Sequence, residues 1–403
     1  MSEEKLVPKL RFSEFDEEWY EVKLNDIATF SKGKGISKND ISDEGIECIR
    51  YGELYTKYGE MIYKTESKTN LNKNGLIFSE KNDILIPCSG ETAIDLATAS
   101  CIQKDQVAIG GDITIIKTNQ YAPFITYYLN QKRTDIAKYA QGVSIVHLYA
   151  KDFKILNLRI PSFDEQKKII HLFEEIVKKE KLLEKKYNYY IEFKKYLMQQ
   201  IFTQKLRFAN FNKKWIKYQF KDLGIVKSGV GFSKKYQGHL NLDYNLYKVS
   251  DMNLEVNKKY MVKSNNTVDN FILKDMNTKL IEKPSIIFAK VGEAIFLNRK
   301  RIVNNPFLID NNMMAFSPNN KVNLEFIYYL SLTINFGKYA QIGALPSYNA
   351  SDIYSIKCEI PSIEEQEKIS SILSLVDEKI DYIKSYINNI IIFRKGLLQQ
   401  MFV

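Results

Sequence analysis

Two stretches of the chain, 163–204 and 361–403, carry apolar residues at alternating spacings of three and four. This spacing lasts for more than about four heptads, which predicts two long amphipathic helices of the coiled-coil type. A helix of ~37 residues is ~55 Å long at a rise of ~1.5 Å per residue. The first seam is Ile169, Phe173, Ile176, Glu180, Leu183, Tyr187, Tyr190, Lys194, Leu197 and Ile201, and the second is Ile369, Leu373, Val376, Ile380, Ile383, Ile387, Ile390, Arg394, Leu397 and Met401.

Both helices begin with the same signature. Ser162 and Ser362 are the expected N-caps, and Glu165 and Glu365 stand three residues later, where a capping box has its carboxylate. Because both seams are apolar, the simplest packing pairs them antiparallel. The alternative is that each helix packs separately on its own lobe. The polar interruptions Lys194 and Arg394 occupy matched seam positions; they either set the register or extend to solvent at the seam edge.

The segments outside these helices indicate two α+β lobes. Short apolar runs predict strands, and 123–140 and 324–340 have helical patterns. The expected domains are 1–162, 163–204, 205–360 and 361–403, with the two lobes separated by two long helices that form an antiparallel coiled coil. The predicted strands are 46–51, 83–87, 113–117 and 155–160 in the first lobe, and 246–250, 285–290, 311–316 and 356–360 in the second.

The chain contains an internal repeat. Residues 9–37 match 205–233 without a gap, and the only two tryptophans, Trp19 and Trp215, form a matched pair. Residues 139–202 match 339–402 with 21 identities in 64 positions. The intervening segments, 38–138 and 234–338, match poorly. The sequence therefore predicts two pseudo-symmetric copies with divergent middles.

Composition excludes several classes of protein. The 403 residues are 45% hydrophobic and 26% charged, as expected of globular domains. No window is apolar enough for a membrane span, and the acidic N-terminus argues against a secretory signal. The four cysteines are far apart, which favours reduced thiols in a cytosol over a disulfide framework or a zinc site.

The net charge of +10 is concentrated in one part of the chain. Residues 1–162 carry 21 basic and 23 acidic side chains, whereas residues 205–360 carry 23 basic and 12 acidic ones. A basic lobe suggests a polyanionic partner such as nucleic acid. The alternative is a basic surface that only interacts with solvent.

No catalytic motif stands out in the sequence. There is no phosphate-binding loop of the Gly-x4-Gly-Lys-Ser/Thr type, and the glycine and proline patterns of an amino-methyltransferase are missing. His147, His171 and His239 have no carboxylate or cysteine at a catalytic spacing. A binding role is therefore favoured over an enzymatic one.

Three paired motifs resemble the specificity subunit of a bacterial type I restriction–modification system. They are the Lys-Leu-Arg-Phe…Trp entry, the Ile-Pro-Ser-x-x-Glu-Gln-x-Lys-Ile helix start and the Leu-x-Gln-Gln-x-Phe helix end, each present twice. The resemblance covers the whole chain in the order lobe, helix, lobe, helix.

This resemblance implies a non-catalytic, cytoplasmic, nucleoid-associated protein of phage defence. Each lobe would be a target-recognition domain for one half of a bipartite, asymmetric site in double-stranded DNA. The coiled coil would set the spacer and dock two methyltransferase subunits, which methylate adenine with S-adenosylmethionine. Two restriction/translocase subunits, which use ATP and Mg²⁺, would complete the endonuclease. No cofactor is expected in this chain, and no membrane partner.

Candidate DNA-binding residues combine basic side chains with hydrogen-bonding groups in or next to loops. The strongest single candidate is the cluster Arg299-Lys300-Arg301, and any one lysine is otherwise a solvated surface charge. The first-lobe candidates are Lys32, Lys34, Ser37, Lys38, Arg50, Tyr51, Lys57, Ser144 and His147. The second-lobe candidates are Lys227, Ser233, Lys234, Lys235, Tyr236, Lys290, Arg299, Lys300, Arg301, Ser347, Tyr348 and Asn349.

Two other functions compete with DNA recognition. A structural coiled-coil adaptor would bind DNA without sequence preference. A nuclease or methyltransferase acting alone would need chemistry that the sequence does not display.

Overall fold

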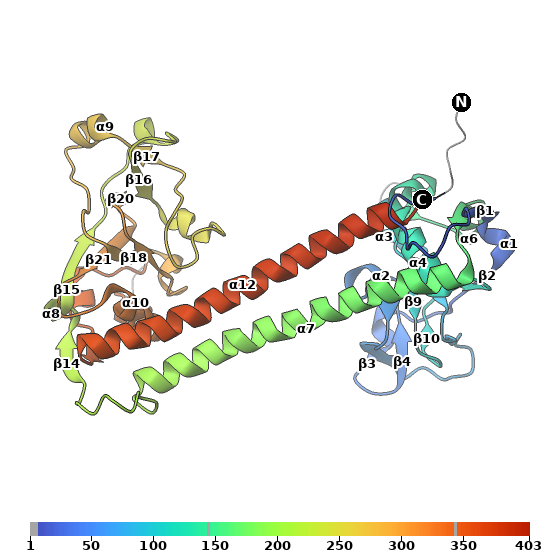
Figure 1. The fold of residues 1–403 in the computed structure, drawn as a ribbon, viewed down its shortest axis with the longest axis horizontal. Helices are drawn as coiled ribbons and strands as arrows, with labels where there is room; N and C mark the ends of the chain where they lie inside the picture. Colours follow the sequence, from blue (N-terminus) through green and yellow to red (C-terminus); the bar gives the residue numbers. More distant parts are fainter. Residues whose placement is uncertain (1–6, 143–145, 342–344) are drawn as a thin grey trace. The chain divides into compact units, whose positions relative to one another are not determined.

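The computed structural model describes residues 7–142, 146–341 and 345–403. The chain forms two compact units, of which unit 1 comprises Met1–Glu184 with Ser385–Val403 and unit 2 comprises Lys185–Lys384. Two long helices, α7 (Phe163–Phe202) and α12 (Ile363–Met401), each contribute a segment to both units (Figure 1). We call the rest of unit 1 lobe 1 and the rest of unit 2 lobe 2.

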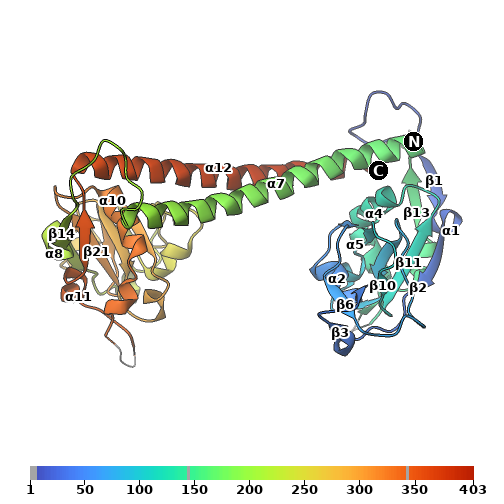
Figure 2. The same ribbon diagram turned by 90° about the horizontal axis from the view of Figure 1, so that it is seen from below.

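The helix segments of unit 1 run antiparallel. The Phe173 ring of α7 lies 6.1 Å from that of Phe402, the residue that follows α12. Further along α7, Glu180 lies 3.3 Å from the Arg394 guanidinium. Residue numbers therefore rise along one helix as they fall along the other (Figure 2).

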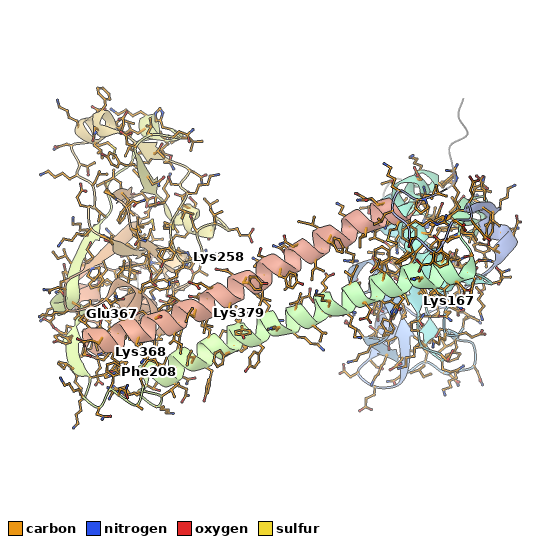
Figure 3. All side chains as sticks on the ribbon, viewed as in Figure 1. Lys167, Phe208, Lys258, Glu367, Lys368 and Lys379 are labelled. Atoms are coloured by element: carbon orange, nitrogen blue, oxygen red, sulfur yellow. The ribbon has the colours of Figure 1, made fainter. Side chains whose placement is uncertain are left out.

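Unit 2 has the same antiparallel arrangement. Lys194 of α7 forms an ion pair with Asp377 of α12, while Ile201 shares a buried cluster with Ile369. Both seams thus pack against each other, as predicted, rather than separately on the lobes. Lys368, on the outer side of this pair, lies over the Phe208 ring at 5.2 Å (Figure 3).

The start of each long helix is tied to its lobe by a buried carboxylate. Arg11 donates two hydrogen bonds to Glu165, at 2.8 and 2.7 Å, and Trp19 Nε1 donates a third at 3.4 Å. Arg207 and Trp215 repeat these bonds with Glu365. These glutamates were predicted as capping-box partners of the helices. Their carboxylates instead accept hydrogen bonds from residues more than a hundred positions away in the sequence.

Two sheets of more than two strands form the body of lobe 1. The larger has the strand order β2-β11-β7-β9-β5, and the smaller has the order β10-β4-β6-β3. Helix α4 (Ala122–Gln131) contributes Phe124 and Tyr127 to a core that also includes Trp19. The strands are β2 (Ala28–Lys32), β3 (Ile41–Ser42), β4 (Ile46–Ile49), β5 (Met61–Ile62), β6 (Ser67–Thr69), β7 (Ile84–Pro87), β9 (Ser100–Ile102), β10 (Ala108–Ile109) and β11 (Ile113–Thr118).

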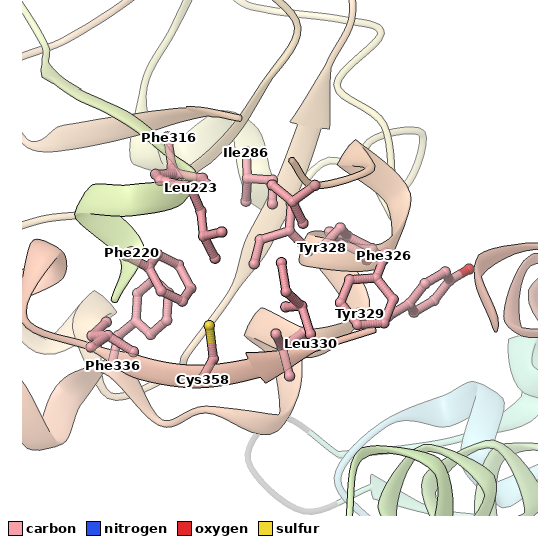
Figure 4. Packing of buried hydrophobic residues seen from close by; sticks show 14 of the residues in the cluster. Phe220, Leu223, Ile286, Phe316, Phe326, Tyr328, Tyr329, Leu330, Phe336 and Cys358 are labelled. Carbon is pink, nitrogen blue, oxygen red and sulfur yellow. The ribbon is translucent and has the colours of Figure 1, made fainter. Parts of the chain in front are cut away.

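Lobe 2 repeats the central strand order of both sheets, with one strand fewer in each, although its sequence diverges. Its larger sheet has the order β15-β21-β18-β19 and its smaller sheet the order β17-β16-β20. Helix α10 (Leu324–Thr333) packs in the core with Phe220, Phe316 and Phe336 (Figure 4). The strands are β15 (Gly224–Ser228), β16 (Tyr244–Tyr247), β17 (Thr267–Val268), β18 (Ser285–Ala289), β19 (Lys300–Val303), β20 (Phe307–Ile309) and β21 (Met313–Pro318).

A separate pair of antiparallel strands closes each lobe next to its helix. They are β1 (Tyr20–Lys23) with β13 (Asn157–Ile160), and β14 (Ile216–Gln219) with β22 (Lys357–Ile360). The predicted fold class, two α+β lobes with an antiparallel pair of long helices, is confirmed. The shorter elements are α1 (Leu24–Ile27), α2 (Tyr51–Thr56), β8 (Ser89–Gly90), α3 (Ala93–Leu96), α5 (Arg133–Ile136), β12 (Val146–His147), α6 (Ala150–Lys154), α8 (Phe220–Leu223), α9 (Asn270–Asp275) and α11 (Ala350–Tyr354).

Most predicted elements differ from the observed ones by one to three residues at their ends, and three of them show how. The strand predicted from residue 155 begins only at Asn157, after the short helix α6. The helical stretch 123–140 is divided at Lys132 into α4, α5 and a final short turn. The stretch 324–340 is likewise divided after Thr333. In each case a local turn interrupts a run whose apolar pattern continues.

Candidate nucleic-acid interface

One edge of the larger sheet of lobe 1 is held by backbone hydrogen bonds between segments distant in sequence. Gly33 N–H donates to Ile113 O at 3.0 Å, and Cys88 N–H donates to Asp112 O at 2.8 Å. Leu148 N–H donates to Cys88 O at 3.1 Å. The ends of β2 and β7, the start of β11 and the segment after β12 therefore meet at this edge.

Lobe 2 has the same set of bonds at matched positions. Gly229 N–H donates to Met313 O at 3.0 Å, Lys290 N–H to Asn312 O at 2.8 Å, and Tyr348 N–H to Lys290 O at 3.3 Å. We call the two matched regions the edge frames. The frame of lobe 1 is 31–34, 49–50, 87–90, 109–114 and 147–151, and that of lobe 2 is 227–230, 247–248, 289–292, 309–314 and 347–351.

The smaller sheet joins each edge frame through one more matched bond. Gly110 N–H donates to Ile49 O at 2.8 Å, and Asp310 N–H donates to Tyr247 O at 3.0 Å. The next residues, Arg50 and Lys248, each begin a turn. Their backbone N–H groups donate to the buried carboxylate three residues later, Glu53 or Asp251. Arg50 and Lys248 are thus structural equivalents.

In each edge frame two backbone segments cross closely at a glycine, Gly33 beside Gly110 in lobe 1 and Gly229 beside Asp310 in lobe 2. We call these places the crossing points. A Cβ atom at Gly33 would lie 2.1 Å from Gly110 O, and one at Gly229 would lie 1.8 Å from Asp310 O. The glycine turn predicted from the sequence is therefore the point at which two backbones approach most closely.

The side chains on the two frames differ although the backbones match. Lobe 1 presents Lys32, which pairs with Asp112 at 3.3 Å, and His147, whose Nδ1 lies 3.1 Å from Ser89 Oγ. Lobe 2 presents the exposed Lys227 and Asn349. Such a difference between equal scaffolds is expected of surfaces that bind different sequences.

The DNA-binding residues predicted for lobe 1 fall into two groups, apart from Ser144. Lys32, Lys34, Arg50 and His147 belong to the edge frame or adjoin it. The others follow it along the chain: Ser37 and Lys38 at a turn in which Ser37 bonds Asp40, and Tyr51 and Lys57 on and after α2, where Lys57 pairs with Glu53 at 3.1 Å. Ser144 lies outside the described residues.

The candidates of lobe 2 are similarly divided. Lys227, Lys290, Ser347 and Asn349 lie in the edge frame. Ser233, Lys234, Lys235 and Tyr236 lie on the segment that follows it, where Lys235 pairs with Asp275 at 2.9 Å and Tyr236 also donates to that carboxylate. Tyr348 is buried, and its hydroxyl donates to Ala289 O.

The structure does not present Arg299, Lys300 and Arg301, the strongest candidate cluster of the sequence, as one surface of three cations. Side chains alternate between the faces of a strand, and here the middle one points inward. Lys300 is only 1% exposed, and its ammonium lies 4.0 Å from the centre of the Phe336 ring. Arg301 is half-buried and donates to the backbone carbonyls of Asn257 and Met252. Arg299 is the exposed member and donates to Asn253.

Sequence reasoning missed four residues of the frames or next to them: Phe30, Tyr149, Lys151 and Lys248. The signal for Lys248 was present, because it stands three residues before an acidic residue as Arg50 does. Tyr149 and Lys151 lie at the start of α6, a short helix that was not predicted. The fourth residue, Phe30, has no local sequence signal.

The part of the chain that the structure describes holds no group of three or more His, Cys, Asp or Glu side chains arranged for a metal ion. None of its helices combines the length and the apolar character that crossing a membrane requires. The site is therefore a surface of cations, aromatic rings and amides on two matched frames.

The family model described as the type I restriction modification DNA specificity domain matches residues 16–205 and again residues 212–391. The chain therefore belongs to this family, with one copy of the domain for each lobe and its helix. This membership confirms the predicted function: a DNA-specificity subunit of a type I restriction–modification system, which is a non-catalytic component.

Individual relatives agree with this assignment. The specificity subunit of the type I restriction enzyme MjaVIII from Methanocaldococcus jannaschii is 22% identical over 409 residues, which cover 91% of this chain and 87% of that protein. The S subunit of a type I restriction–modification system from M. genitalium matches 98% of this chain and 99% of its own at 18% identity, with a TM-score of 0.59. The HsdS subunit from Thermoanaerobacter tengcongensis matches 95% and 96% at 11% identity, with a TM-score of 0.52. The solved structures share the fold of this chain.

Proposed function

We propose that each edge frame reads one half of a bipartite, asymmetric site in double-stranded DNA. The observation that carries this proposal is the pairing of equal backbones with unequal side chains. Because the backbones match, both edge frames can face DNA in the same orientation. Because the side chains at matched positions differ, each lobe has its own base preference.

Cations near the frames would hold phosphates without reading sequence. In lobe 1 these are Lys32, Lys34, Arg50 and Lys151, and in lobe 2 they are Lys227, Lys248 and Lys290. Lobe 1 is otherwise near neutral in charge, so its grip on DNA depends on few side chains. Partner subunits would supply the rest of the affinity.

The long helices would dock the catalytic partners. Several large apolar side chains point to solvent on them: Leu182, Ile392 and Phe393 in unit 1, and Tyr189 and Leu375 in unit 2. Contiguous exposed apolar side chains mark protein–protein contacts, and Ile392 and Phe393 are neighbours in the sequence. We propose that two methyltransferase subunits, which use S-adenosylmethionine, dock there, and that two restriction/translocase subunits, which use ATP and Mg²⁺, join through them.

Coexpression with the methyltransferase subunit, followed by mapping of methylated adenine across the host genome, tests this proposal. A gapped, asymmetric motif methylated on both strands, and absent without this chain, is the expected result. An intact complex that produces no such motif would contradict sequence-specific reading and favour the adaptor function.

A further inference from the structure

The edge frame of lobe 1 contains a hollow of about 680 Å³. Two aromatic rings, Phe30 and Tyr149, line it together with Lys32, Lys151, Cys88 and Thr114. Its shape and chemistry define the class of ligand that it fits.

One wall of the hollow is a preorganised aromatic platform. The Tyr149 ring stacks on the His147 ring, with centroids 6.0 Å apart and planes at 14°. The His147 ring is fixed by a hydrogen bond between its Nδ1 and Ser89 Oγ, at 3.1 Å. The Tyr149 backbone N–H donates to the Asp152 carboxylate at 2.9 Å. Tyr149 is nevertheless 44% exposed, so the ring is fixed in place but accessible.

The floor of the hollow is neutral and polar, whereas its rim is cationic. Cys88 Sγ and Thr114 Oγ1 lie 3.0 Å apart, and burial raises the pKa of the Cys88 thiol, which keeps it uncharged. The exposed Lys32 and Lys151 stand at the rim. A ligand that satisfies both parts is flat, neutral and aromatic, with an attached anion. A nucleobase with its backbone phosphate has this composition.

At the matched positions of lobe 2 the side chains that line the hollow are replaced by others. Val226 stands where lobe 1 has Phe30, and Met314 where it has Thr114. Lys290 and Asn349 replace Cys88 and Tyr149 at the matched backbone positions. Lobe 2 therefore offers polar contacts to base edges, whereas lobe 1 offers a stacking platform.

We propose that the hollow of lobe 1 receives a nucleobase drawn out of the DNA stack, with its flanking phosphates held by Lys32 and Lys151. Stacking on Tyr149 compensates for part of the cost of unstacking the base. This inference rests on the proposed function. It means that the two lobes read DNA by different physical mechanisms.

The test uses the complex with its methyltransferase subunit and duplexes of the mapped target. 2-Aminopurine, which fluoresces when unstacked, is placed in turn at each position of both half-sites. The half-site of lobe 1 is identified by exchanging residues 38–138 with those of a relative. We expect one position of that half-site to brighten in addition to the methylated adenine, and no such extra position in the other half-site.

Variants connect the signal to the platform. Tyr149→Ala should abolish the extra fluorescence and weaken binding by roughly tenfold or more, while Tyr149→Phe should retain both. Tyr20→Ala, which removes an equally exposed ring elsewhere in lobe 1, is the matched control and should change neither. On a duplex altered only in the lobe 1 half-site, each variant should bind as tightly as the wild type does on that duplex. Equal binding there shows that the variant is folded.

Two results would overturn the inference, and they differ. If the gapped motif is methylated but no position brightens in a Tyr149-dependent way, lobe 1 reads DNA without displacing a base, and the proposed function stands. If the wild-type complex yields no gapped motif, the proposed function fails and the inference fails with it.

Discussion

Lys194 of α7 and Asp377 of α12 form an ion pair at 2.5 Å, at the seam where the two helices of unit 2 meet. Tyr329 of lobe 2 donates to the same carboxylate at 2.7 Å, so the pair also joins the helices to the lobe. Arg394, the matched seam cation, lies close to Glu180 of α7 and Glu60 of lobe 1. The ion pairs of both matched seam cations, Lys194 and Arg394, therefore connect the two helices to each other and to a lobe.

Removing one member of this pair should destabilise unit 2. Lys194→Met leaves the half-buried Asp377 carboxylate without its cation, and we expect a loss of roughly 1–3 kcal/mol in the free energy of unfolding. Urea denaturation of Lys194→Met, Asp377→Leu and the double variant measures the coupling. Strictly additive losses would show that the two side chains do not interact.

The glycines at the crossing points should be far more sensitive than their near neighbours. Gly33→Ala and Gly229→Ala place a Cβ against a carbonyl oxygen, so each should destabilise its lobe by roughly 1–3 kcal/mol and disturb one half-site. Gly35→Ala and Gly231→Ala are matched controls, because a Cβ there meets nothing within 4 Å. Thermal denaturation compares the four variants. Equal effects at Gly33 and Gly35 would contradict the close approach.

The buried Lys300 predicts a specific pH dependence of stability. Burial lowers the pKa of its ammonium from 10.5 to about 7 in the folded chain. Between these two values the unfolded chain binds more protons than the folded chain, so this group makes stability rise with pH from about 7 to about 10.5.

Lys300→Met should remove this dependence and should stabilise the protein at neutral pH, because no buried cation is then required. Denaturation midpoints of both proteins across that pH range measure the difference. Parallel curves for the two proteins would show that Lys300 titrates normally in the folded state.

The cations of the lobe 2 edge frame should carry part of the salt dependence of DNA binding. Lys290→Ala should weaken binding and lower the slope of log affinity against log salt by about one, as for a lost phosphate contact. Lys283 is exposed near the opposite end of β18 and provides the matched control. Equal slopes for Lys290→Ala and the wild type would remove Lys290 from the interface.

The repeat and the helix pair could be predicted because their signals are local and periodic. The seam residues recur every three or four positions, and the two tryptophans mark equivalent points. The anchoring of Glu165 by Arg11 was not predicted, since a carboxylate near a helix start has a more local role available in the capping box. Only the folded chain brings the two residues together.

The candidate site was predicted less well than the fold. The glycine turns and the candidates Lys32, Lys227 and Lys290 lie in the edge frames. The burial of Lys300 was not foreseen, because it depends on which face of β19 meets the core. The match between the two edge frames could not be predicted from the sequence. Backbone hydrogen bonds hold both frames, and such bonds do not depend on which side chains are present.

The most direct test of the account is the exchange of residues 38–138 for the corresponding segment of another specificity subunit, followed by adenine-methylation mapping. This segment contains residues 49–50, 87–90 and 109–114 of the lobe 1 edge frame and none of lobe 2. The account predicts a hybrid motif in which one half-site changes while the other is retained. A motif changed in both halves, or in neither, would contradict the claim that each lobe reads its own half of the site.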